Sequence, residues 1–132
     1  VKDAYATLQK TFGFTDQYPS GIARYEHDDY NLADPGTLGN PWFITSLWIA
    51  QYHIERKDTH TALRFIEWVA KHMTDSGVLS EQINPHSGDF ISVAPLAWSQ
   101  AEFVNTLLDI AIEPVTESAK TIAQPEAHEA AR

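Results

Sequence analysis

The sequence predicts an all-α fold in which an inner and an outer layer of helices carry long loops at their ends. Two segments lead to this prediction. Residues 40–57 have apolar side chains on most of their helical circumference, which is typical of a helix buried on several sides. Residues 60–74 have one apolar stripe and one charged face, which is typical of a surface helix. The chain of 132 residues is long enough for one domain with a single core.

The first helix is predicted over residues 1–12. Ala4, Leu8 and Phe12 share one helical stripe, and Gly13 follows as a stop signal. No capping residue precedes this helix and the chain starts at Val1, so we expect the sequence to be a piece of a longer protein. Residues 14–40 then form a loop rich in Gly, Pro, Asp and Tyr, and loops of such length are usually functional.

The second helix is predicted to start at Asn40, with Asn40 as its N-cap and Pro41 in its first turn. Trp48, which lies within this helix, is expected to pack into the hydrophobic core. The third helix, over residues 60–74, is expected to bury five apolar residues and to end at Gly77. These are Ala62, Phe65, Ile66, Val69 and Met73.

The last helix is predicted over residues 96–112, with Ser99 and Glu102 as a possible capping box. Between it and the third helix lies a loop with a turn signature at residues 84–88, Asn-Pro-His-Ser-Gly. Residues 113–132 contain two prolines and four glutamates, and we expect a polar tail there, partly ordered or loose. The domain is therefore expected to cover residues 1–112.

Composition excludes several classes of function. The chain has 18 acidic residues against 9 Lys and Arg, so its net charge of −9 opposes nucleic acids and anionic membrane surfaces. It has no cysteine, no apolar run of about 20 residues and no metal-binding or nucleotide-binding motif, so we expect no membrane span, metal or cofactor. No signal peptide is visible, which favours a cytoplasmic location.

Candidate functional residues lie in the two long loops and at the helix starts that follow them. Arg24 and Asp28 stand among tyrosines, Glu81 stands between Ser80 and Gln82, and Trp42 and Trp98 begin helices. A single glutamate in a loop is usually a solvated surface group, and a tryptophan is often part of the hydrophobic core. Carboxylates, Arg and aromatic rings together nevertheless suit polyhydroxyl ligands, because polar groups bind hydroxyls and rings cover C–H faces.

Four motifs in this order resemble the C-terminal part of the catalytic domain of glycoside hydrolase family 15. They are GIARYEHDDY at 21–30, GNPWF at 39–43, LSEQ at 79–82 and PLAWS at 95–99. The family includes glucoamylases, glucodextranases and some trehalases. The resemblance implies a fragment of an (α/α)6 barrel from an enzyme that cleaves α-glucosidic bonds with inversion and releases glucose from non-reducing ends.

The resemblance also implies roles for five residues. Glu81 would be the general base, Arg24 would bind the terminal glucose, Asp28 would be its acidic neighbour, and Trp42 and Trp98 would line the pocket. Family members carry the general acid upstream of these motifs, so the isolated chain is expected to be inactive. An α-linked gluco-oligosaccharide or polysaccharide is the expected partner, and its exact identity stays open.

One alternative function remains at this point. The chain could be a non-catalytic helical module for carbohydrate binding or regulation, because the family's fold recurs in regulatory subunits of phosphorylase kinase. A partial barrel would also leave the apolar helix 42–57 uncovered, so self-association of the chain is expected.

Overall fold

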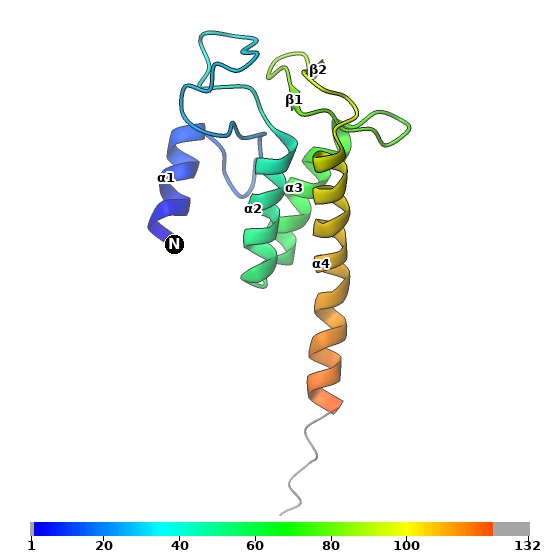
Figure 1. Cartoon of the computed structure of the whole chain (residues 1–132). Coiled ribbons are helices and arrows are strands. Elements are labelled where there is room, and N and C mark those ends of the chain that lie inside the picture. Colours follow the sequence, from blue (N-terminus) through cyan, green and yellow to red (C-terminus); the bar gives the residue numbers. More distant parts are fainter. Residues whose placement is uncertain (1, 123–132) are drawn as a thin grey trace, which may run out of the picture.

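The computed structural model describes residues 2–122 and contains four helices and one small antiparallel sheet (Figure 1). The helices are α1 (Lys2–Phe12), α2 (Phe43–Glu55), α3 (Thr59–Lys71) and α4 (Ala97–Ile122). The strands are β1 (Gln82–Ile83) and β2 (Phe90–Ile91), paired in the register Gln82 with Ile91 and Ile83 with Phe90. The prediction of a helix-dominated fold is confirmed. None of the described helices is long and apolar enough to cross a membrane.

Helix α2 is the central element, because it packs against both α3 and α4. Nine of its 13 residues are buried, as the apolar circumference predicts. Residues 20–42 of the loop after α1 and residues 72–96 lie at the same end of α2, α3 and α4 (Figure 1). The beginning of the first loop instead runs toward the other end of α2, where Asp16 Oδ1 lies 3.7 Å from His53 Nε2. The helices thus present residues 20–42 and the second loop on one side, which is where the candidate site residues are found.

The core forms around the two sides of α2. One cluster joins α2 to α3 and to the loop that follows α1, through Phe14, Ile22, Ile49, Ala50, Phe65 and Ile66. The other cluster reaches the loop end, through Phe43, Leu47, Val69, Leu79 and Ile83. Four of the five residues predicted for the apolar stripe of α3 are buried, and Met73 is partly buried just after the helix.

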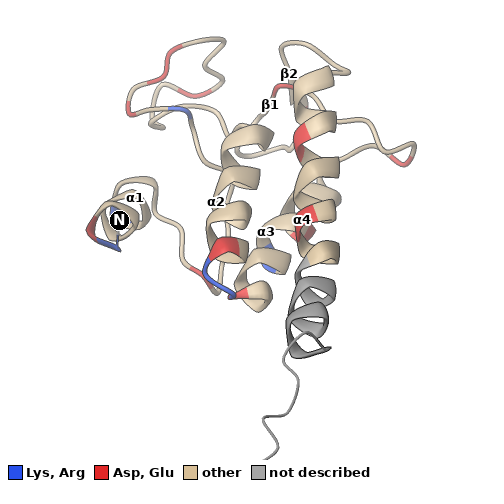
Figure 2. Ribbon diagram, turned by 60° about the horizontal axis from the view of Figure 1, so that its bottom comes forward, with Lys and Arg blue, Asp and Glu red and all other residues tan. Residues whose placement is uncertain are grey.

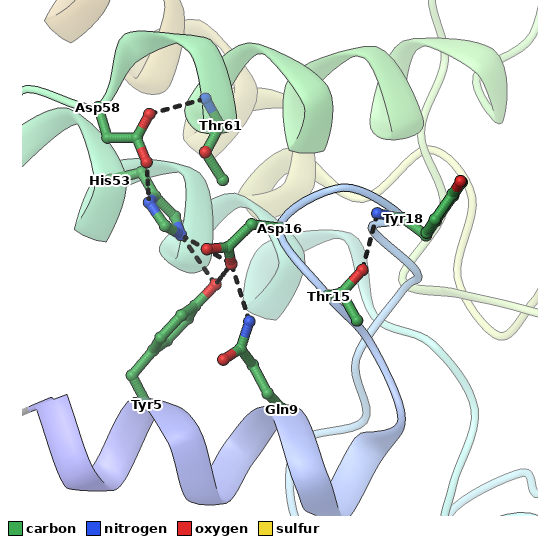
Figure 3. Close-up of polar contacts among 8 residues, drawn as sticks. All are labelled: Tyr5, Gln9, Thr15, Asp16, Tyr18, His53, Asp58 and Thr61. Carbon is green, nitrogen blue, oxygen red and sulfur yellow. Dashed lines mark hydrogen bonds and ion pairs between the residues drawn. The ribbon is translucent and has the colours of Figure 1, made fainter.

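Helix α1 is held by a polar network rather than by buried side chains of its own (Figure 3). The Tyr5 hydroxyl donates to Asp16 Oδ1 at 2.5 Å and lies 2.8 Å from Nε2 of the buried His53. His53 Nδ1 lies 3.2 Å from Asp58, whose other oxygen accepts from the Thr61 N–H and so caps α3. Burial raises the pKa of Tyr5 well above its usual range, so the phenol stays a donor.

The predicted cap of α2 is wrong. The helix begins at Phe43, and its N-cap position is Trp42, whose side chain makes no capping bond. Asn40 is buried, and its amide bonds the loop instead: it accepts from the Ala33 N–H and donates to Asn31 O and Gln82 Oε1. The usual preference of Asn for the N-cap position is overridden here, because its side-chain amide already bonds three other groups.

The predicted end of α4 is also different. The helix continues to Ile122 rather than stopping near residue 112. Pro114 predicts an earlier end of the helix, because proline lacks the N–H of a helical hydrogen bond. The segment that follows it contains Glu117, Ala119 and Lys120, which favour helix. The expected tail is thus helical over residues 113–122, and its remainder, residues 123–132, lies outside the described residues. The turn predicted at residues 84–88 is confirmed, although the short strands that it joins were not predicted.

We expect Tyr5→Phe to lower the free energy of unfolding by about 1–3 kcal/mol, because it leaves the buried His53 Nε2 without its phenol partner. Tyr52→Phe is the matched control: it removes the same atom from the ring stacked on Tyr5 at 4.7 Å. Urea unfolding of both variants measures the difference. Equal loss in the two variants would show that the network does not anchor α1.

Candidate active site

Three segments of extended backbone build the floor of the site. The Trp42 N–H donates to Ile22 O at 3.0 Å, and the Ile83 N–H donates to Pro41 O at 3.0 Å. Trp42 is thereby bridged to Ile22 on one side and to Gln82 on the other. These bridges join the loop that carries Arg24 to the loop that carries Glu81, although 57 positions separate the two residues along the chain.

Arg24 and Asp28 form a two-bond ion pair. Arg24 Nε and Nη2 donate to the two carboxylate oxygens of Asp28, each at 2.8 Å. Asp28 is 1% exposed and also accepts from the Tyr30 N–H. The hydrogen bonds from Arg24 hold the pKa of Asp28 below its usual range, so the carboxyl is charged despite its burial. Acidic residues, red in Figure 2, are the main charged groups of the loop between α1 and α2, and Arg24 is the single Lys or Arg between residues 13 and 42.

The Arg24 guanidinium lies over the Trp42 ring, 4.2 Å from its centroid. Tyr25 and Tyr30 flank the same guanidinium at 5.3 and 5.2 Å. Trp42 is only 3% exposed, so this tryptophan supports Arg24 rather than presenting an open ring face. The structure therefore brings Arg24, Asp28 and Trp42 together, with the guanidinium bonded to Asp28 and stacked on Trp42.

Glu81 is partly exposed and lies directly before β1. The Ser92 hydroxyl donates to Glu81 Oε2, and the Glu81 N–H donates to Val93 O at 2.9 Å. The pKa of Arg24 is raised, chiefly by its hydrogen bonds to Asp28, and the negative charge of Glu81 adds to this effect. Glu81 is thus close enough to Arg24 for their charges to interact.

Trp98 lies in the first turn of α4 and is 51% exposed. Two bonds tie this turn to the segment before Glu81: the Ser99 hydroxyl donates to Ser80 O at 2.8 Å, and the Leu96 N–H donates to Leu79 O at 3.0 Å. Trp98 is therefore linked to the Glu81 loop through the backbone. Its ring packs against Trp48, with centroids 6.1 Å apart.

Two sequence predictions about this region are wrong. Trp48 is 45% exposed rather than core, and its Nε1 donates to Glu102. Ser99 and Glu102 form no capping box, because Ser99 bonds Ser80 and Glu102 holds Trp48 and Gln51. Apolar spacing identifies the face of a helix, but it does not tell which neighbour covers that face.

Asn40 and Gln82 are structural parts of the site that the motifs alone did not single out. Both are fully buried, and Asn40 Nδ2 donates to Gln82 Oε1 at 2.7 Å. Among the described residues, Trp42 Nε1 and Gln82 Nε2 are buried donors without a hydrogen-bond partner. Such donors are uncommon in folded proteins, and a ligand oxygen or a water commonly satisfies them.

No group of three or more His, Cys, Asp or Glu side chains in the described part of the chain is arranged to hold a metal ion. The site offers instead two carboxylates, one guanidinium and aromatic rings, a set that binds hydroxyl groups and moves protons.

The lowered pKa of Asp28 predicts acid sensitivity. A carboxyl with a depressed pKa stabilises the folded state above its unfolded value of about 3.9, and this contribution is lost as the pH falls through the folded value. Unfolding measured from neutral pH down to about pH 2 should therefore show a steep loss, and Asp28→Asn should be less stable at neutral pH and flatter below about pH 4. The exposed neighbour Asp29 gives the control, Asp29→Asn; a steep loss that persists in Asp28→Asn would contradict this role.

Comparison with known proteins agrees with the motifs. Residues 53–108, which include Glu81 and Trp98, match the family described as "Glycosyl hydrolases family 15". Arg24, Asp28 and Trp42 lie outside that match. A curated relative, "Uncharacterized glycosyl hydrolase MJ1610" of Methanocaldococcus jannaschii, is 35% identical over 117 residues, which covers 79% of this chain and 17% of the relative.

The chain thus spans about a sixth of the length of the curated relative that it matches. No solved structure matches it. The family match contains the motifs at residues 79–82 and 95–99. Together with the relative, it shows that this chain is similar to part of a glycosyl hydrolase, with residues 53–108 similar to family 15.

Proposed function

We propose that this chain is part of a glycoside hydrolase that cleaves α-glucosidic bonds with inversion and releases glucose from non-reducing ends. The observation that carries the proposal is the bridged backbone at Trp42, which joins the segment of Arg24 to the segment of Glu81. A proton-accepting carboxylate and a hydroxyl-binding guanidinium on neighbouring segments are what the polar end of a sugar pocket requires.

Glu81 is proposed as the general base. In an inverting glycosidase, one carboxylate removes a proton from the water that attacks the anomeric carbon, while a carboxylic acid on the opposite face protonates the leaving oxygen. The base must be ionised at the working pH, which requires polar surroundings. The Ser92 hydroxyl donates to Glu81 Oε2, so the carboxylate has a polar neighbour that orients it.

Arg24 is proposed to bind the hydroxyls of the terminal glucose. Its bonds to Asp28 use Nε and Nη2, and its side chain is 33% exposed, so guanidinium N–H groups remain for a ligand. Asp28 fixes the direction of the guanidinium, and Trp42 supports it from below. The buried donors Trp42 Nε1 and Gln82 Nε2 support an oxygen-rich ligand here.

The general acid is proposed to lie in a part of the whole protein that precedes these motifs, within an (α/α)6 barrel of which α2, α3 and α4 are a portion. The central α2 with α3 beside it is compatible with an inner and an outer helix of such a barrel. The presence of Glu81 and Arg24 on bridged segments favours catalysis over the purely regulatory alternative, which needs neither residue.

In the full-length protein, Glu81→Gln should lower glucose release from maltose by at least about 100-fold, because the amide keeps the shape but removes the base. Glu26→Gln, on an exposed acidic residue of the Arg24 loop, is the matched control. The 132-residue chain alone should release no glucose. Near wild-type turnover in Glu81→Gln would refute the assignment, and turnover by the isolated chain would refute the missing acid.

The expected exposure of helix 42–57 is wrong, because nine of the 13 residues of α2 are buried. We propose instead that the isolated chain self-associates through the apolar side of α4. Large apolar side chains that are more than a third exposed lie on α4 and on the neighbouring α2: Val104, Leu107, Leu108 and Trp48. Exposed apolar surface of this kind favours association in water. Sedimentation velocity should show a dimer or larger species that Leu108→Glu converts to monomer; a monomeric wild type would contradict the proposal.

A further inference from the structure

A cavity of about 590 Å³ lies between the loop that follows α1 and the turn that joins β1 to β2. It is bounded by the end of α1, by loop residues 20–39, by the end of α3 and by the turn between β1 and β2. Its volume falls in the range of about 300–1,000 Å³ that is common for small-molecule sites. None of the five candidate site residues lines it, so the family resemblance assigns it no role.

The extended backbone at Trp42 separates this cavity from the candidate active site. Ala23, Pro41 and Ile83 line the cavity, whereas the residues next to them, Arg24, Trp42 and Gln82, do not. Successive side chains of extended segments point to opposite faces, and these segments are bridged to one another. The cavity and the Arg24–Trp42 stack therefore lie on opposite faces of the same small backbone layer.

The cavity wall is uncharged and rich in glycine. No Lys, Arg, Asp or Glu lines it, although 20% of the chain is charged. Five of the six glycines line it: Gly13, Gly21, Gly36, Gly39 and Gly88. At Gly21 a Cβ atom would collide with Pro41 and the Trp68 ring, so glycine lets that indole reach the wall. His86 of the wall is already paired with Asp34 at 2.7 Å, so this pair offers no free counter-charge to an ionic ligand, which favours a neutral ligand.

The polar groups of the wall both donate and accept. The rings of Trp68 and His72 are adjacent, with centroids 4.5 Å apart. His72 Nδ1 lies 2.7 Å from Trp68 O and must donate to that carbonyl, so Nε2 of the neutral ring is an acceptor. Asn84 uses its Oδ1 for the N–H groups of His86 and Ser87, and its Nδ2 is a donor.

We propose that this cavity is a second carbohydrate site, which binds a neutral α-linked gluco-oligosaccharide against Trp68 and His72. A sugar has hydroxyls that donate and accept and C–H faces that pack on aromatic rings, and this wall offers partners for each of them. Only the choice of an α-glucan rests on the proposed function. The cavity would hold a glucan chain apart from the residues that cleave it.

Nuclear magnetic resonance of this chain titrated with maltotriose tests the proposal, because each of its four tryptophans has one indole N–H signal. The Trp68 signal reports the cavity, whereas the Trp42 and Trp98 signals report the candidate active site. We expect a saturable shift of the Trp68 signal. His72→Phe keeps a ring on Trp68 but removes Nε2, and should weaken the binding read at Trp68 about fivefold, the effect of one lost hydrogen bond.

His60→Phe, on an exposed histidine of the same helix that does not line the cavity, should leave this binding unchanged. Equal binding in the two variants would overturn the proposal, as would a Trp68 signal that maltotriose leaves unmoved. In the latter case, shifts at Trp42 or Trp98 would still support sugar binding at the Arg24 site. Shifts at Trp68 alone would support the second site and count against sugar binding by Arg24.

Discussion

The extended backbone at Trp42 is the feature on which the rest of the structure depends. It is bridged to Ile22 on one side and to Gln82 on the other, and it leads directly into the buried helix α2. The hydroxyls of Thr45 and Ser46 in the first turn of α2 reinforce the same junction, because both bond the backbone of Ile22 or Trp42. Two long loops are thereby fastened to the buried central helix α2.

This junction explains how flexible residue types become a defined site. Arg24 and Glu81 belong to loops, where side chains are usually mobile. Arg24 is fixed by Asp28 through two bonds and by Trp42 through stacking, and Glu81 is fixed at its backbone by Val93 and at its carboxylate by Ser92. The order of these side chains therefore comes from bonds between loops rather than from helical packing. A site built this way keeps its guanidinium and carboxylate oriented before a ligand arrives, which lowers the cost of binding.

The sequence predicts the helices well because apolar spacing is a local signal. It distinguishes the buried α2 from the amphipathic α3, and glycine and proline mark the turn at residues 84–88. It fails where a side chain has several possible partners. Asn40 does not cap the helix, because its amide donates to Gln82. Trp48 does not pack into the core, and its Nε1 donates to Glu102. The residues of the site can be named from their motifs, but the stacking of Arg24 on Trp42 depends on contacts between distant segments that no local pattern contains.

The role proposed for Glu81, a general base opposite a separate acid, determines the stereochemistry of the product. Proton nuclear magnetic resonance can follow the first glucose that the full-length protein releases from an α-linked substrate. We expect β-glucose to appear first, because water attacks the face opposite the leaving group. Initial release of α-glucose would mean a retaining reaction, in which the second carboxylate is a nucleophile, and it would contradict the role assigned to Glu81.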